Sequence, residues 1–218
     1  MPKNIAVLFD LDGTLIDSNE IIIESYFHAF KTFRPDLKLR REDVLTFIGP
    51  TLEMVFKEYV SDDQIAPMIQ TYRDYYVANE GLHHTLYPGV VKGLMDLKNL
   101  GVKLSIVTSK YKEAAWRSFT HYQLDTFFDA FVALDDVKTP KPDKEPVEVA
   151  LKRLGGADYA IMIGDNHGDI LSGQNAGIEG AGVAWSIKGK AFLNQVNPDV
   201  VFDTMDDIVQ YISQKLEV

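Results

Sequence analysis

The chain has 218 residues, of which 46% are hydrophobic and 25% are charged, which is the composition of a folded globular protein and excludes a disordered one. Its 22 Lys and Arg residues against 32 Asp and Glu residues give a net charge of −10, so the surface would repel a nucleic acid and we expect no such partner. The absence of cysteine excludes disulfide bonds and thiol catalysis.

The length suits one domain, or one domain that carries an insertion. The first residues hold a single apolar run that ends in acid, which is too short and too charged for a secretory signal or a membrane span. We therefore expect a cytoplasmic protein without a membrane partner.

The first predicted element is a strand from Ile5 to Phe9, and two aspartates, Asp10 and Asp12, follow it. An uninterrupted apolar run is typical of a strand buried on both faces of a parallel sheet, and ligands of such sheets bind at the carboxyl ends of the strands. Two carboxylates so close together repel each other. The pair therefore predicts a bound cation, or a proton that is held for catalysis.

Two other structures could place aspartates here. A calcium loop that starts at Asp10 would need glycine where Leu15 stands and glutamate where Ile21 stands, so that loop is excluded. An ordinary Asp-Gly turn stays open on this motif alone.

The next segment, from Ile16 to about Tyr87, contains no convincing strand. Its apolar and aromatic residues recur at the spacing of a helix face, which predicts an all-helical insertion. We assign residues 16–85 to a helical cap domain and residues 1–15 and 86–218 to an α/β core domain. The two stripes that carry this prediction are Ile23, Phe27 and Phe30, and Ile65, Met68, Ile69, Tyr72 and Tyr76.

From Pro88 onward, β-rich apolar runs alternate with helix-like stretches, which is the pattern of a doubly wound, Rossmann-like parallel sheet. The predicted fold class is therefore α/β, with the all-helical cap inserted into it. Further strands are expected from Val102 to Val107, Ala130 to Leu134, Ala160 to Ile163, Gly182 to Ala184 and Val200 to Phe202. Helices are expected from Val90 to Leu100, Tyr111 to His121, Glu145 to Leu154, Ile170 to Ala176 and Met205 to Ile212.

Polar residues follow three of these predicted strands. Thr108 and Ser109 come after the second, where they either cap the next helix or direct a hydroxyl and an N–H at a phosphate oxygen. Lys141 stands between two prolines, which would present its ammonium from a stiff loop, although a solvated linker lysine is the simpler explanation of the tripeptide by itself. Asp165 ends the strand from Ala160, and Asp169 opens the following helix.

Helix capping alone could account for Asp169 but not for Asp165, because Asp165 lies at the end of the strand. His167 between them is expected to be a loop or surface histidine, since hard oxygen ligands predominate around it.

Taken in chain order, these four signals resemble the motifs of the haloacid dehalogenase (HAD) superfamily of phosphotransferases. They match as DLDGTL, Val107-Thr108-Ser109, Lys141-Pro142 and GDNHGD. The match spans the whole chain, and the helical insertion looks like the small helical cap of that superfamily. Dehalogenases in the superfamily lack the second aspartate of the first motif, so Asp12 argues against cleavage of a carbon–halogen bond.

The resemblance implies catalytic roles for four residues. Asp10 would attack phosphorus and become a phosphoaspartate, and Asp12 would protonate the leaving group and later deprotonate the attacking water. Thr108 and Lys141 would stabilise the transferring phosphoryl group. A carboxylate can attack a phosphate dianion only if cations neutralise the charge, which Mg²⁺ and Lys141 would do.

The resemblance also implies a set of ligands. Asp10, the backbone carbonyl of Asp12 and Asp165 would hold Mg²⁺, with Asp169 at the same metal site, where it would orient Lys141 or a water. The backbone N–H groups of Leu11 and Ser109 would bind the phosphoryl oxygens.

Within the superfamily, the chain looks most similar to the bacterial HAD-type inorganic pyrophosphatases, with phosphoglycolate phosphatases as near relatives. This impression comes from the cap segment 42–52, from residues 134–137, from Asn166-His167 and from residues 182–189. A small phosphorylated substrate is expected, and pyrophosphate suits a closing cap that excludes water and adds modest positive charge.

Two details of substrate binding stay open. The turn at Gly49, Pro50 and Thr51 either meets the opening of the core and contacts substrate or only joins two cap helices. Lys110 either contacts the leaving phosphate or is an ordinary lysine of the first helical turn.

Three other functions remain possible. The chain could be a phosphoglycolate or sugar-phosphate phosphatase, or a phosphomutase of the β-phosphoglucomutase type, which would pass the phosphoryl group to a sugar phosphate instead of water. It could also be a catalytically silent binding module. The sequence predicts no oligomeric state.

Overall fold

The computed structural model describes residues 4–79 and 84–217. The chain divides into two compact units, Met1–Ile16 with Leu86–Val218, and Asp17–Thr85. We call the first the sheet unit and the second the helical unit.

The sheet unit is built on six strands in the order β5-β4-β1-β6-β7-β8, and every neighbouring pair is parallel. The chain starts in the middle of the sheet, builds one edge and then returns to build the other, which makes the predicted doubly wound α/β fold. The strands are β1 (Ile5–Phe9), β4 (Lys103–Val107), β5 (Ala130–Val132), β6 (Tyr159–Gly164), β7 (Glu179–Val183) and β8 (Val200–Phe202).

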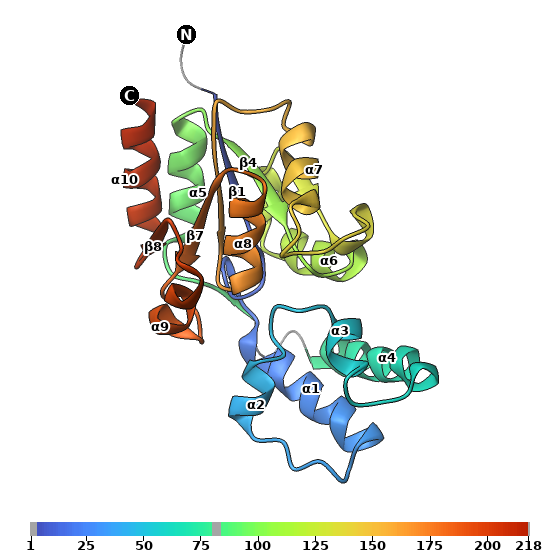
Figure 1. Cartoon of the computed structure of the whole chain (residues 1–218). Helices are drawn as coiled ribbons and strands as arrows, with labels where there is room; N and C mark the ends of the chain where they lie inside the picture. The colour runs from blue at the N-terminus through green and yellow to red at the C-terminus, as the bar shows by residue number, and fades with distance from the viewer. Residues whose placement is uncertain (1–3, 80–83, 218) are drawn as a thin grey trace. The chain divides into compact units, whose positions relative to one another are not determined.

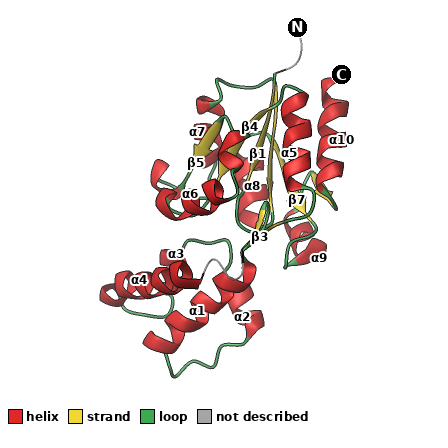
Figure 2. Ribbon diagram, turned by 180° about the vertical axis from the view of Figure 1, so that it is seen from behind, coloured by secondary structure: helices red, strands yellow, loops and turns green. Residues whose placement is uncertain are grey.

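Helices cover both faces of this sheet, as the opposite views of Figures 1 and 2 show. They are α5 (Val90–Asn99), α6 (Lys112–His121), α7 (Glu145–Arg153), α8 (His167–Asn175), the short α9 (Gly189–Leu193) and α10 (Met205–Leu216). Three 3₁₀ turns lie between them, at Leu124–Thr126, Leu134–Asp136 and Asn194–Val196.

The alternation of side chains in β1 explains why the sheet needs helices on both sides. Ile5, Val7 and Phe9 belong to a core cluster with residues of α5, α6 and α10, whereas Ala6 and Leu8 belong to a second cluster with residues of α7. All five residues are almost fully buried, which accounts for the uninterrupted apolar run.

Several predicted boundaries in the sheet unit were wrong. Helix α10 runs four residues beyond the predicted Ile212, to Leu216, and β5 ends at Val132, two residues before the predicted Leu134. Strand β7 begins at Glu179, three residues before the predicted start, because Gly180 is a packing residue and not a turn. A Cβ on Gly180 would lie 2.2 Å from the carbonyl oxygen of Ile170, so only glycine lets α8 approach the strand this closely. Helix α8 begins at His167 and not at Ile170, because Asn166 is its N-cap residue and Asp169 lies inside its first turn.

The helical unit consists of α1 (Asn19–Phe33), α2 (Arg41–Leu45), α3 (Leu52–Phe56) and α4 (Asp62–Asn79). Aromatic rings fill its core: the centroid of Tyr26 lies 4.9 Å from that of Tyr72 and 5.7 Å from that of Phe56. Met68, Tyr72 and Tyr76 of the predicted stripe are buried on α4. The unit therefore has an apolar core of its own.

The prediction that the insertion contains no strand was wrong at its two ends. Residues Ile16–Asp17 form β2 and Thr85–Leu86 form β3, and the two pair as a small sheet. A strand of two residues is too short to give the alternating pattern that reveals strands in a sequence.

No helix within residues 4–79 and 84–217 has the combined length and apolar character that crossing a membrane requires.

Candidate active site

The four sequence motifs meet at the carboxyl edge of the sheet. In the register of the sheet, Phe9 of β1 lies beside Ile106 of β4 and Ile163 of β6, so the three strands end at nearly the same level. Asp10, Thr108 and Asp165 therefore leave the sheet along one edge, as expected for the ligand-binding edge of an open α/β sheet.

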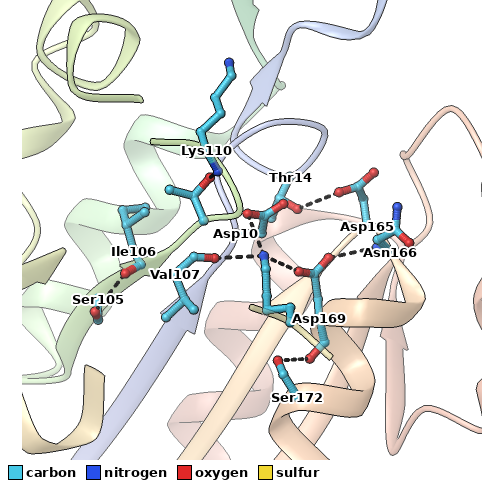
Figure 3. Close-up of polar contacts among 12 residues, drawn as sticks. Asp10, Thr14, Ser105, Ile106, Val107, Lys110, Asp165, Asn166, Asp169 and Ser172 are labelled. Atoms are coloured by element: carbon cyan, nitrogen blue, oxygen red, sulfur yellow. Dashed lines mark hydrogen bonds and ion pairs between the residues drawn. The ribbon is translucent and has the colours of Figure 1, made fainter. Parts of the chain in front are cut away.

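Three carboxylates lie together at this edge. One oxygen each of Asp10, Asp165 and Asp169 can be chosen so that all three atoms lie within 4.8 Å of one another. Asp165 and Asp169 are only 2% and 1% exposed, and Asp10 is 9% exposed. We call these three residues the acidic triad, and Figure 3 shows their side chains converging.

The acidic triad has the donor set of a site for a hard divalent cation. All its ligand atoms are carboxylate oxygens, which Mg²⁺ and Ca²⁺ prefer. The Oδ2 atom of Asp165 is buried and finds no hydrogen-bond partner among the described residues. A buried carboxylate oxygen without a partner is costly, and a cation would satisfy it. The residues present therefore fit a metal ion.

Lys141 joins two members of the acidic triad. Its Nζ atom lies 3.0 Å from Oδ1 of Asp10 and 2.5 Å from Oδ1 of Asp169, and it also donates to the carbonyl oxygen of Val107 at 2.9 Å. The lysine is only 8% exposed, so the solvated linker lysine is excluded. The three acceptors use all three donors of the ammonium.

Burial is the largest single influence on the pKa values of Asp10, Asp165 and Lys141. It raises the pKa of the Asp10 carboxyl to about 7, although Lys141 opposes the shift. Burial, followed by the charges of Asp169 and Asp10, raises the pKa of Asp165. Burial by itself would lower the pKa of Lys141, but the two carboxylates that it contacts outweigh it and the pKa is raised. One ammonium shared by several carboxylates stays charged and leaves excess negative charge, which a divalent cation would offset.

Asp169 both caps a helix and contacts Lys141, which are the two roles that the sequence suggested for it. Its Oδ2 atom accepts a hydrogen bond from the backbone N–H of Asn166 at 2.9 Å, which caps α8, while its Oδ1 atom contacts Lys141. Gly164 makes room for this carboxylate, since a Cβ at that position would lie 2.2 Å from Cγ of Asp169. The helix cap therefore also positions the lysine.

Asp12 forms an ion pair that the sequence did not predict. Its Oδ1 atom lies 2.8 Å from Nζ of Lys110, and the two side chains are 13% and 20% exposed. Thr14, in the turn after Asp12, places its Oγ1 atom 3.5 Å from Oδ1 of Asp165. The first motif thus contacts the fourth through a hydroxyl that sequence reasoning did not single out.

Neither Thr108 nor Ser109 caps α6, because the N-cap residue of that helix is Tyr111. The Oγ1 atom of Thr108 instead accepts from the backbone N–H of Lys110 at 3.2 Å, and Thr108 is 6% exposed beside the triad's edge of the sheet. Of the two alternatives for these hydroxyls, the cap of the next helix was therefore wrong.

The remaining predicted site residues are placed as follows. Leu11 is fully buried, and its carbonyl oxygen accepts from the N–H groups of Leu15 and Ile16, which closes the turn around the first motif. Thr51 accepts a hydrogen bond from the N–H of Met54 and caps α3, at the end of the Gly49-Pro50-Thr51 turn in the helical unit. A contact of this turn with substrate stays a prediction.

His167 is not part of the acidic triad. Its ring stacks on that of Phe192 with centroids 3.7 Å apart, and its Nε2 atom lies 2.7 Å from the carbonyl oxygen of the same residue.

Sequence reasoning did not predict that Lys188, whose Nζ atom lies 4.7 Å from the Phe192 ring centre, comes near the site. Burial lowers the pKa of Lys188, while Asp165 and then Asp169 raise it. The sequence could have indicated that Lys188 lies near the site, because Lys188 belongs to the loop after β7, and β7 is the strand beside β6.

Comparison with known proteins supports a single family. The family model described as haloacid dehalogenase-like hydrolase matches residues 7–183. The chain is 44% identical over 211 residues to a protein named pyrophosphatase PpaX from Bacillus velezensis, covering 96% of this chain and 97% of that protein. It is 42% identical over 211 residues to a protein of the same name from Bacillus cereus, covering 95% of each.

The fold has relatives among solved structures. A predicted phosphatase from Clostridium acetobutylicum superposes with a TM-score of 0.85 at 29% identity, over 98% of this chain and all of that one. The agreement of sequence, fold and site leads to one conclusion: the chain belongs to the haloacid dehalogenase-like hydrolases and is a phosphatase of that family.

Proposed function

We propose that the protein is a Mg²⁺-dependent phosphohydrolase that works through a phosphoaspartate intermediate and hydrolyses inorganic pyrophosphate to two phosphates. The observation that carries the proposal is the position of Asp10, whose carboxylate shares Lys141 with Asp169 and lies within 4.8 Å of the other two acids of the triad. A carboxylate that attacks phosphorus needs such positive charge nearby, because the phosphate is itself an anion.

The first half of the reaction transfers the phosphoryl group to the protein. An oxygen of Asp10 forms a bond to phosphorus as the bond from phosphorus to the leaving oxygen breaks, and Asp12 donates a proton to that oxygen. Lys141, which holds Asp10 at 3.0 Å, keeps the nucleophile in place and offsets its charge. Mg²⁺, held by Asp10, the backbone carbonyl of Asp12 and Asp165, with Asp169 beside them, would supply the positive charge that lets an anion approach a phosphate.

The second half returns the protein to its starting state. Asp12 takes a proton from a water molecule, the water oxygen bonds to phosphorus, and the bond between phosphorus and Asp10 breaks. Phosphate is released and both aspartates recover their original protonation. Thr108 and the N–H groups of Leu11 and Ser109 would bind the phosphoryl oxygens during both halves.

The helical unit would act as a cap that excludes water, with Gly49, Pro50 and Thr51 as its contacts to substrate. Pyrophosphate is favoured as substrate because proteins that share 42% and 44% identity with nearly the whole chain are named pyrophosphatases. A cytoplasmic location stays a prediction from the sequence.

Phosphate release from a panel of substrates tests the proposal. The wild-type protein with Mg²⁺ should release phosphate fastest from pyrophosphate in comparison with phosphoglycolate, hexose phosphates and nucleotides, and chelation of Mg²⁺ should abolish the release. Asp10→Asn removes the nucleophile, so the rate should fall on the order of 10³-fold or more. Equal rates for the variant and the wild type would refute the phosphoaspartate, whereas isomerisation of a hexose phosphate without phosphate release would indicate a mutase.

A further inference from the structure

Lys110 lies at the site but has no part in the mechanism above. Its ammonium lies 2.8 Å from Oδ1 of Asp12, so the site holds two lysine–aspartate pairs: Lys141 with Asp10 and Lys110 with Asp12. In Figure 3 the side chain of Lys110 extends away from the acidic triad. The second positive charge is therefore separate from the one beside the nucleophile.

The backbone of Lys110 is fixed at both of its polar groups. Its N–H donates to Oγ1 of Thr108 at 3.2 Å, and its carbonyl oxygen accepts from the N–H of Leu134 at 2.9 Å. The side chain remains 20% exposed. A lysine with an anchored backbone and a partly exposed ammonium can exchange one anionic partner for another by rotating its side chain alone.

The proposed role of Asp12 indicates which part of a substrate would lie close to the ammonium of Lys110. A residue that protonates the leaving group must lie within about 2.6–3.2 Å of the leaving oxygen. A cation in contact with Asp12 is therefore also close to the leaving group. Asp10, Asp12, Asp165 and Asp169 would repel a leaving group that carries its own negative charge, so such a group needs a cation on this side of the site.

We infer that Lys110 binds the leaving group of substrates in which that group is itself an anion, and so selects phosphoanhydrides such as pyrophosphate over simple phosphate esters. This inference rests on the proposed function, and it assigns the second phosphate to a named residue. Without substrate, Asp12 holds the ammonium near the position where the anion would bind. The side chain of Lys110 is a substrate-binding group and takes no part in proton transfer.

Comparison of substrates with charged and uncharged leaving groups tests this assignment. Pyrophosphate and phosphoglycolate have an anionic leaving group, whereas the leaving group of phenyl phosphate has no charged substituent. Lys110→Met should lower kcat/KM for pyrophosphate about 10- to 100-fold, the effect of losing one charged contact, and that for phenyl phosphate less than about 3-fold. Lys110→Arg keeps the charge and should retain most of the activity on pyrophosphate.

Lys112 provides a matched control. It is an exposed lysine two residues along the chain, and Lys112→Met removes the same charge from the surface without touching Asp12. This variant should keep the wild-type ratio between the two substrates. Equal losses of Lys110→Met on pyrophosphate and phenyl phosphate would overturn the inference, because they would mean that Lys110 acts only through Asp12. Unchanged kinetics on both substrates would overturn it as well.

A binding measurement separates this inference from the proposed function. In the Asp10→Asn background, calorimetry with Mg²⁺ measures the affinity for pyrophosphate without turnover, and adding Lys110→Met should weaken it by at least about 10-fold. An unchanged affinity would refute the role of Lys110. If the wild type hydrolyses phosphoglycolate but not pyrophosphate, the proposed substrate is wrong, and the same kinetic comparison then decides the role of Lys110 with phosphoglycolate.

Discussion

The proposed metal site depends on a residue that has no side chain. Gly13 has a φ of +80°, and a Cβ there would lie 2.5 Å from Oδ2 of Asp165, the oxygen that is buried without a hydrogen-bond partner among the described residues. The glycine of the first motif therefore allows the left-handed turn and also leaves space for an Asp165 oxygen that is a proposed metal ligand. A side chain at this position would displace the Asp165 carboxylate.

Gly13→Ala should weaken metal binding as well as the fold. The left-handed backbone alone costs about 1–2 kcal/mol for a residue with a Cβ, and displacement of Asp165 should raise the Mg²⁺ concentration for half-maximal activity about 10-fold or more. Titration of activity with Mg²⁺ and urea unfolding measure the two effects. Gly101→Ala is the control, because Gly101 has a φ of +77° with open space around its Cβ position. If both variants need the same Mg²⁺ concentration, the contact with Asp165 is unimportant.

At the scale of elements, Glu179 ties α10 to two strands of the sheet. It begins β7 and accepts hydrogen bonds from Tyr159 of β6, from Tyr211 of α10 at 2.8 Å, and from Nζ of Lys215 at 2.8 Å. Burial would raise the pKa of Glu179, but these hydrogen bonds outweigh it and the pKa is lowered. The charged form of Glu179 therefore stabilises the packing of the last helix.

Glu179→Gln should destabilise the protein in a pH-dependent way. A carboxyl whose pKa is lowered by folding adds stability above its unfolded pKa, about 4.3, and that stability is lost as the pH falls through the lower folded value. The variant should lose about 1–3 kcal/mol of unfolding free energy at pH 7, and the difference from the wild type should shrink below about pH 5. Urea unfolding between about pH 7 and pH 3 measures it.

Glu113 is a suitable control for this prediction. It is exposed on α6, and Glu113→Gln should change the unfolding free energy by less than about 0.5 kcal/mol at every pH. A pH-independent loss in Glu179→Gln would indicate a packing effect and not the loss of a charged acceptor.

At the scale of the whole molecule, the acidic triad joins the two halves of the sheet. Asp10 follows β1, whereas Asp165 and Asp169 follow β6, and all three carboxylates are close to fully buried. Folding gathers negative charge in a site where Lys141 contacts Asp10 and Asp169 and neutralises part of it. A bound divalent cation should therefore stabilise the sheet unit, since the unfolded chain does not assemble the site.

Mg²⁺ should raise the melting temperature of the metal-free protein. At a concentration of about 100 times its dissociation constant the stabilisation is about 2.7 kcal/mol, which corresponds to about 5–10 °C for a chain of this size. Asp165→Asn should abolish most of the shift. Thermal unfolding with and without Mg²⁺ measures it, and Asp125→Asn on an exposed 3₁₀ turn is the control. An equal shift in both variants would place the cation elsewhere.

The fold class, the carboxyl ends of β1 and β4 and the acids at the sheet edge could all be predicted from the amino-acid sequence. Buried strands and amphipathic helices have a regular spacing of apolar residues that is visible in the sequence. An acidic residue directly after a buried strand is unusual unless it has a functional role, so Asp10 and Asp165 can each be identified without knowledge of their neighbours in space. The family followed from four motifs in a fixed order and is confirmed by the family model and the relatives.

Which of these side chains contact one another became known from the folded structure. The pairing of Lys110 with Asp12, the contact of Thr14 with Asp165 and the two-residue strands β2 and β3 join positions far apart in the chain, and no local pattern encodes them. The same holds for Gly180, which looks like a turn residue but lies where α8 packs against β7. Periodicity reports which face of an element is buried, whereas contacts across the sheet depend on register and close packing, which exist only once the chain has folded.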